Sequence, residues 1–164
     1  MLSRGDAVAY KCKGMYKVEE IGTLDFSFAD RDKKYYTLQS LEDERDKAYV
    51  PTDDITNIRR PVSRDEAMEL IERFDQIEVL CVKNEKSREQ EYKDCIADCC
   101  PENWLRVLKT LYRRTKMRGS VTSMDRKYQQ LLEHALYSEF AFALGIPMCS
   151  MAEFIESQRA QAVE

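Results

Sequence analysis

The chain has 164 residues, of which 43% are hydrophobic and 34% are charged, so it fits one or two small globular domains rather than a disordered tail. Lys and Arg number 26 against 30 Asp and Glu, a net charge of −4, which argues against a globally basic nucleic-acid coat protein. No apolar run approaches the roughly 20 residues that cross a bilayer. The first residues also lack an apolar run of signal-peptide length. We therefore expect a cytoplasmic protein with no membrane partner.

The first third of the chain alternates runs of β-forming residues with turn residues. Runs rich in Val, Tyr, Ile and Thr predict strands at residues 7–10, 15–21, 34–39 and 47–50. Gly, Asp and Pro lie between these runs, and strands so closely spaced are typical of a small antiparallel barrel or curled sheet.

The pattern changes to helical after Pro61. Ser63 followed by Glu66 forms a capping box, and apolar residues recur from there at helical spacing. Pro101 suits the first turn of a further helix, where its missing N–H costs nothing. Gly119 interrupts that helix, and the helical pattern then resumes.

These patterns predict an α+β fold with two domains. The β module spans residues 1–61, and an α-helical bundle spans residues 62–164. Within the bundle we expect linker helices at 62–100 and a basic helical core at 101–164.

Charge is distributed unevenly along the helical domain. Residues 63–100 carry 6 basic and 11 acidic groups, whereas residues 101–144 carry 8 basic and 4 acidic groups. The negative net charge therefore conceals a basic helical segment.

The basic segment contains closely spaced cations: Arg106, Lys109, Arg113, Arg114, Lys116 and Arg118. The first three are three and four residues apart and so share a helix face, while Arg126 and Lys127 begin the next helix. Cations on adjoining helices can neutralise phosphates without reading a base sequence. A solvated helix face is the alternative, and the scarcity of acidic partners here keeps the DNA interpretation open.

The cysteines limit the redox and metal chemistry of the chain. Without a secretion signal we interpret the six of them as reduced thiols. Cys95, Cys99 and Cys100 form a C-x3-C-C pattern, which lacks the C-x2-C pairs or His partners of structural zinc sites. Free thiols are the favoured interpretation, and metal binding or redox sensing is the alternative.

No catalytic motif is present in the sequence. The single histidine, His134, lies beside apolar residues, which predicts a packed or rim position, and no Ser or Cys forms a recognisable pair with it. Phosphate-binding glycine loops and H-E-x-x-H are also missing. We expect no enzyme activity, no cofactor and no small-molecule substrate.

The one tryptophan, Trp104, stands at helical spacing with Leu108 and Leu111. Such a stripe predicts a core position. Insertion into a DNA base step is the alternative.

Seven segments, in order along nearly the whole chain, resemble the CarD/CdnL family. Residues 5–10 resemble its opening G-D-x-V-x-Y, residues 17–21 its second strand, and residues 34–38 its Y-x-L strand. Residues 49–51 resemble its [VI]-P strand end, and residues 60–63 its R-P-[VI]-[ST] junction. In the helical part, residues 107–114 are similar to its L-x-x-R segment and residues 137–141 to its x-x-E-L-A stripe.

The resemblance implies a bacterial transcription regulator. In such proteins a Tudor-like β module, similar to that of the transcription-repair coupling factor, docks on the lobe of the RNA polymerase β subunit. The helical domain then contacts promoter DNA at the upstream edge of the bubble, and in well-known members it stabilises the open complex. A tryptophan wedge in the minor groove assists there.

This sequence departs from the family pattern at the wedge and at the docking positions. The region where the family has its tryptophan reads Asn-Glu-Lys-Ser-Arg at residues 84–88, so we do not transfer the wedge role to Trp104. Some members carry docking arginines on the β module, and the matching positions are Leu24 and Tyr49. Arg126 does fall where the family has a basic residue near DNA.

Two mechanisms remain open at this point. In the first, the β module binds polymerase through Leu24, Tyr36, Tyr49 and Pro51. The helical domain then contacts promoter DNA, weakly when alone, through Arg106, Lys109, Arg113, Arg114, Arg126 and Lys127. In the second, the chain is a protein–protein adaptor or a thiol-based sensor that makes no DNA contact.

Overall fold

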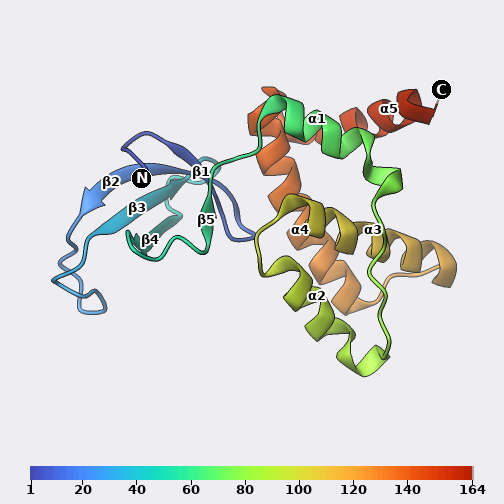
Figure 1. The fold of residues 1–164 in the computed structure, drawn as a ribbon, viewed down its shortest axis with the longest axis horizontal. Helices are drawn as coiled ribbons and strands as arrows, with labels where there is room; N and C mark the ends of the chain where they lie inside the picture. The colour runs from blue at the N-terminus through green and yellow to red at the C-terminus, as the bar shows by residue number, and fades with distance from the viewer. Residues whose placement is uncertain (164) are drawn as a thin grey trace. The chain divides into compact units, whose positions relative to one another are not determined.

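The computed structural model describes residues 1–163, and the chain divides into two units that meet between residues 61 and 62. Figure 1 shows an antiparallel sheet in the first unit and helices throughout the second. The predicted α+β fold class is confirmed.

The first unit, here the β unit, is one five-stranded antiparallel sheet. Its strands are β1 (Ala7–Tyr10), β2 (Gly14–Gly22), β3 (Tyr35–Ser40), β4 (Lys47–Pro51) and β5 (Ile58–Arg59). They lie in the order β4-β3-β2-β1-β5, and a register shift between Val18 and Glu20 interrupts the β2–β3 pairing. The four predicted strands are confirmed. The two-residue strand β5 was missed, because so short a run carries no alternation.

One face of the sheet forms the core of the β unit. Alternate residues of neighbouring strands meet there: Val8, Tyr10, Tyr16, Val18, Tyr36, Leu38, Val50 and Ile58. Since successive side chains point to opposite faces, the residues between them lie on the other face. The Tyr16 hydroxyl donates to Asp46 at 2.7 Å, which pairs the one polar atom of a fully buried ring.

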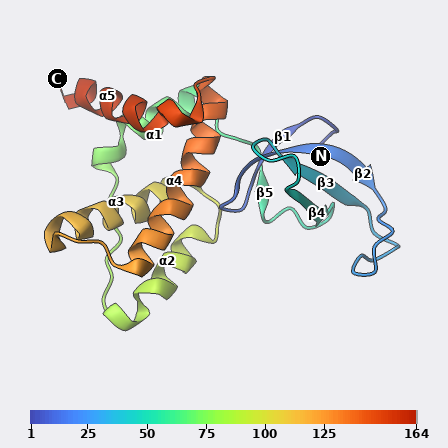
Figure 2. The same ribbon diagram turned by 180° about the vertical axis from the view of Figure 1, so that it is seen from behind.

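The second unit, here the helical unit, contains five α-helices. They are α1 (Arg64–Glu72), α2 (Arg88–Ile96), α3 (Pro101–Arg118), α4 (Ser123–Leu144) and α5 (Met151–Val163). Short 3-10 turns cover Phe74–Gln76, Glu85–Ser87 and Met148–Ser150. Figures 1 and 2 both show α2, α3 and α4 side by side, with α5 running along α1.

The helix ends follow from local sequence. The Ser63 hydroxyl accepts from the Glu66 amide at 3.1 Å, and the Glu66 carboxylate accepts from the Ser63 amide at 2.8 Å, so the predicted capping box is confirmed. Pro101 is the first residue of α3. Gly119 ends that helix with φ 74°, a left-handed conformation that glycine adopts without steric cost.

Residues 77–84 are not helical, although apolar spacing predicted helix throughout this domain. The segment runs irregularly along α3, where the Leu80 amide donates to the Thr110 hydroxyl at 2.8 Å. A partner 30 residues away therefore holds this backbone, and local spacing does not carry that information.

The core of the helical unit contains an aromatic side chain and a charged pair. Trp104 is buried and its indole N–H donates to the Ile96 carbonyl at 3.2 Å, so the predicted core position is confirmed. Asp125, 1% exposed, accepts two hydrogen bonds from Arg88 at 2.9 and 3.0 Å and links the start of α4 to the start of α2. The Thr122 hydroxyl caps α4 by accepting from the Asp125 amide at 3.2 Å.

Glu139 holds the start of the helical unit. Its carboxylate, buried on α4, accepts from the Val62 amide at 2.8 Å.

Within residues 1–163 no single helix is both long and apolar enough to span a membrane. Taken together, α4 and the segment with α5 have the length and composition of a span, but they are bent by 108° relative to each other.

Candidate functional site

Strand β4 leaves one edge of the β unit open. It is the last strand in the sheet order, and among the residues described here no strand pairs with its outer edge. Thr52 donates to the Lys34 carbonyl and Ser40 donates to the Asp46 carbonyl, which fixes the alternation of paired positions along β3 and β4. By that alternation the amide and carbonyl of Tyr49 point to the open edge. An open edge of this kind is a template for pairing with another chain.

An exposed aromatic cluster lies beside this edge. Phe26 and Phe28 are 44% and 71% exposed, and their rings stack with centroids 5.2 Å apart and planes 9° from parallel. The Tyr49 ring lies 5.2 Å from Phe26 and 6.1 Å from Phe28. We name Phe26, Phe28 and Tyr49 the aromatic ridge.

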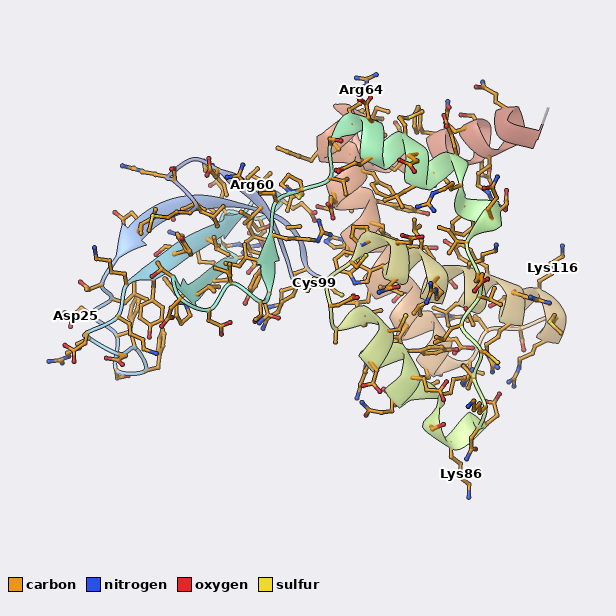
Figure 3. All side chains as sticks on the ribbon, viewed as in Figure 1. Asp25, Arg60, Arg64, Lys86, Cys99 and Lys116 are labelled. Carbon is orange, nitrogen blue, oxygen red and sulfur yellow. The ribbon has the colours of Figure 1, made fainter. Side chains whose placement is uncertain are left out.

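The aromatic ridge is held in place by the loop that follows β2. Within this loop, in which Figure 3 labels Asp25, the Ala29 amide donates to the Phe26 carbonyl at 3.1 Å. The Asp30 amide donates to the Tyr35 hydroxyl at 3.1 Å, which fastens the loop to β3. Phe26 and Phe28 were not among the residues predicted to bind polymerase. Their F-x-F spacing between two strands was the available signal, but it does not say that the rings face solvent.

Three of the four residues predicted to bind polymerase lie on the face of the sheet opposite the core. Tyr49 and Pro51 alternate with the core residue Val50 along β4. Leu24 lines a shallow recess together with Thr37, which pairs with Tyr49. Tyr36 is 3% exposed and belongs to the core cluster, since it lies one position from Thr37 along β3. We therefore assign Tyr36 to packing.

Two of the six predicted DNA-binding cations already have hydrogen-bond partners within the helical unit. Arg114 donates to Asp125 at 3.2 Å and to Glu85 at 3.0 Å. Burial alone would lower the pKa of Arg114, but these two carboxylates outweigh it and raise the pKa. Lys109 donates to the carbonyls of Asp75 and Ile77 at 2.7 and 2.6 Å, so it closes the turn after α1.

Two further cations have intermediate positions. Arg106 is half-buried, and its charge acts on the thiol of Cys95. The Lys127 ammonium lies 3.8 Å from a Glu89 oxygen and 5.4 Å from the centroid of the Tyr128 ring, although most of the side chain is exposed.

The remaining cations project from the helical unit with open hydrogen-bonding capacity. Arg113 and Arg126 are exposed, and within residues 1–163 neither side chain makes a hydrogen bond or an ion pair. The same holds for Lys116 and Arg118, in the last turn of α3, where Figure 3 labels Lys116. Basic residues in a last turn also stabilise the helix through its dipole. These four side chains are the cations of α3 and α4 that remain available to an outside partner.

The cysteines do not assemble into a metal site. In the part of the chain described here, no group of three or more His, Cys, Asp and Glu side chains could hold a metal ion. None of the six cysteines forms a disulfide within the described residues, and Cys99 is buried. Burial raises the pKa of Cys95, against the opposing charge of Arg106, so less of this thiol is the reactive thiolate at neutral pH.

Part of the chain matches a known protein family. Residues 2–62 match the family described as the CarD-like/TRCF RID domain, and no curated protein matches the chain. The matched residues are those of the β unit, with its open edge and its aromatic ridge.

Proposed function

We propose that this chain, whose residues 2–62 belong to the CarD-like/TRCF RID family of RNA-polymerase-interacting domains, is a bacterial transcription regulator. In this proposal the Tudor-like β unit docks on the polymerase β subunit in the cytoplasm. The helical unit then contacts promoter DNA near the upstream edge of the bubble and modulates the stability of the open complex.

The aromatic ridge beside the open β4 edge is the observation that supports docking. Stacked aromatic rings exposed on a small domain are typical of protein-binding surfaces. The outward amide and carbonyl of Tyr49 would pair with a partner strand, while the ridge covers apolar side chains of that partner. Pro51 has no amide hydrogen, so the pairing register would end there.

The docking surface of this chain is apolar rather than charged. Leu24 and Tyr49 occupy the positions where some family members carry arginines. The polymerase surface that binds here would therefore be apolar, and the affinity would depend only weakly on salt, because salt screens charges and not apolar contacts.

Tethering explains how a net-acidic chain would use DNA. The exposed cations Arg113, Lys116, Arg118 and Arg126 offer only a few phosphate contacts, too few for strong binding at physiological salt. Docking on polymerase raises the local concentration of the helical unit at the promoter, so weak contacts become effective. Since Trp104 is buried, the proposed DNA contact uses phosphates and not insertion of that ring.

The thiol-sensor alternative draws less support. The raised pKa of Cys95 disfavours the thiolate that oxidants attack, and Cys99 is buried. We also propose that the chain is not an enzyme, because no nucleophile–base pair or metal-ligand group stands out among the residues described.

The docking proposal is tested with the ridge variant Phe28→Ser/Tyr49→Ser. Its affinity for the isolated lobe of the polymerase β subunit should fall by about tenfold or more, measured by calorimetry. Phe142→Ser is the matched control, because Phe142 is 46% exposed but lies on α4. Equal binding by the ridge variant and the unmodified chain would overturn the docking proposal.

A further inference from the structure

Two adjoining cavities in the helical unit share a set of lining side chains. The first, here the chamber, has a volume of about 310 Å³ and is lined by α1, α3, α4 and α5. The second, here the groove, has a volume of about 680 Å³ and lies between α3 and residues 74–79. Phe74, Tyr112 and Arg159 line both cavities, so the chamber and the groove adjoin at these three side chains.

The chamber is chiefly apolar. Leu105, Leu136 and Phe140 line its interior and are buried. Ala152 and Glu156 are exposed residues of α5 in the same lining, so the chamber opens to solvent along that helix. A volume of about 310 Å³ lies at the small end of ligand pockets, which range from about 300 to 1,000 Å³.

The groove is cationic along α3. Lys109, Arg113 and Lys116 are four and three residues apart, so they follow one another along one face of the helix. Lys109 already serves two backbone carbonyls, whereas Arg113 and Lys116 have no partner within residues 1–163. Arg159 brings the cations of the lining to four, and Asp75 and Glu78 are its two carboxylates, so the groove has an excess of two positive charges.

Arg159 lies where the two cavities meet. Its guanidinium donates to Asp75 at 2.6 Å and stacks over the Phe74 ring at 4.6 Å. This pairing neutralises Asp75, so the carboxylate repels an incoming anion less. It also leaves a planar cation between an apolar chamber and a cationic groove.

We propose that the chamber and the groove together bind a small amphipathic anion, with a compact apolar body in the chamber and a phosphate group in the groove. A neutral apolar ligand would leave the unpartnered cations Arg113 and Lys116 unused. The phosphate backbone of DNA would leave the chamber unused. Because the same two cations are candidates for DNA contact, a bound ligand would compete with promoter DNA for them.

Calorimetry on the full chain tests this with 1-naphthyl phosphate as the probe. We expect 1-naphthyl phosphate to bind at one saturable site. 1-Naphthol lacks the phosphate group and inorganic phosphate lacks the apolar ring, so each should bind roughly tenfold more weakly or worse. If 1-naphthyl phosphate does not bind, or if either fragment binds as tightly as the whole probe, the proposal is overturned.

Two variants locate the site. Ala152→Phe should fill the mouth of the chamber, and Arg113→Glu/Lys116→Glu should reverse the charge of the groove. Each variant should bind 1-naphthyl phosphate about tenfold more weakly or worse. Lys83→Glu/Lys86→Glu is the control, because it makes the same charge change at exposed lysines outside both cavities. Retained binding in both site variants, or equal loss in the control, would contradict the assignment.

Discussion

The β unit and the helical unit expose different chemistry. The β unit presents stacked aromatic rings beside an unpaired strand edge. The helical unit instead presents arginines and lysines that have no carboxylate partner within residues 1–163. In each unit the same residue types are also used internally. Tyr36 and Tyr16 fill the β core, and Arg88 and Arg114 pair with Asp125 in the helical core.

The contrast shows that partner geometry, not residue type, separates a structural side chain from an available one. Arg113 and Arg114 are neighbours in α3, yet only Arg114 reaches Asp125 and Glu85. Tyr36 and Tyr49 are on adjacent strands, yet only Tyr49 lies on the outer face. Variants that replace a buried or paired side chain in one case and an exposed one in the other test this conclusion.

The largest effect is expected from the buried pair in the helical unit. Asp125→Ala would remove the buried carboxylate that Arg88 pairs with and leave it the exposed Glu85 at 3.3 Å. It should reduce the free energy of unfolding by about 3–5 kcal/mol. Chemical denaturation followed by circular dichroism measures this. Asp94→Ala is the control, because Asp94 is exposed and accepts a hydrogen bond from Gln90 on its own helix. Its free energy of unfolding should stay within about 0.5 kcal/mol of that of the unmodified chain. A small loss for Asp125→Ala would show that the pair is dispensable.

A comparable contrast is expected inside the β unit. Leu38→Ala removes a side chain that is 0% exposed and should cost about 2–5 kcal/mol of unfolding free energy. Phe28→Ala removes a larger but exposed ring and should change it by no more than about 0.5 kcal/mol. If Phe28→Ala destabilises the protein as strongly as Leu38→Ala, the ridge is part of the fold and not a free surface.

Substitution of the available cations should weaken DNA binding without lowering the stability of the fold. In a complex with polymerase and promoter, Arg113→Glu/Arg126→Glu should lower the slope of log K against log salt by about 0.9 per lost phosphate contact. Arg114→Glu should instead destabilise the helical unit, because it places a third carboxylate beside Asp125 and Glu85. Salt titration of the complex, with thermal unfolding of the chain, separates the two. An unchanged slope and an unchanged open-complex lifetime would remove Arg113 and Arg126 from the DNA-binding set.

The smallest effect is the change in stability with pH that Tyr128 causes in alkaline solution. Burial, the hydrogen bond to Glu89 and the charge of Glu89 raise its pKa from 10 to about 12. A raised pKa in the folded state means that this stabilisation is present below pH 10 and is lost as the pH rises towards 12. Denaturation midpoints measured from pH 9 to 12 should fall less steeply for Tyr128→Phe than for the unmodified chain. Parallel curves would contradict the assignment.

Local sequence predicted most of the helices and strands. Alternation placed four of the five strands, and the capping box, Pro101 and Gly119 placed helix ends, because each signal involves residues a few positions apart. It failed at β5, which is too short to alternate, and at residues 77–84, whose backbone is held from α3. The sequence also showed the cluster of cations. It did not show which of them would be paired inside the helical unit and which would remain available to a partner.

The sequence by itself therefore determined the order of elements, the two-part plan and the concentration of positive charge in residues 101–144. The tertiary structure alone decided that Arg114 is paired and Arg113 is not, that Phe26 and Phe28 stack on Tyr49, and that Phe74, Tyr112 and Arg159 join two cavities. The physical reason is range. Helix and strand patterns repeat between near neighbours, whereas an ion pair, a loop seated on a strand or a cavity between helices joins residues that are far apart in the chain.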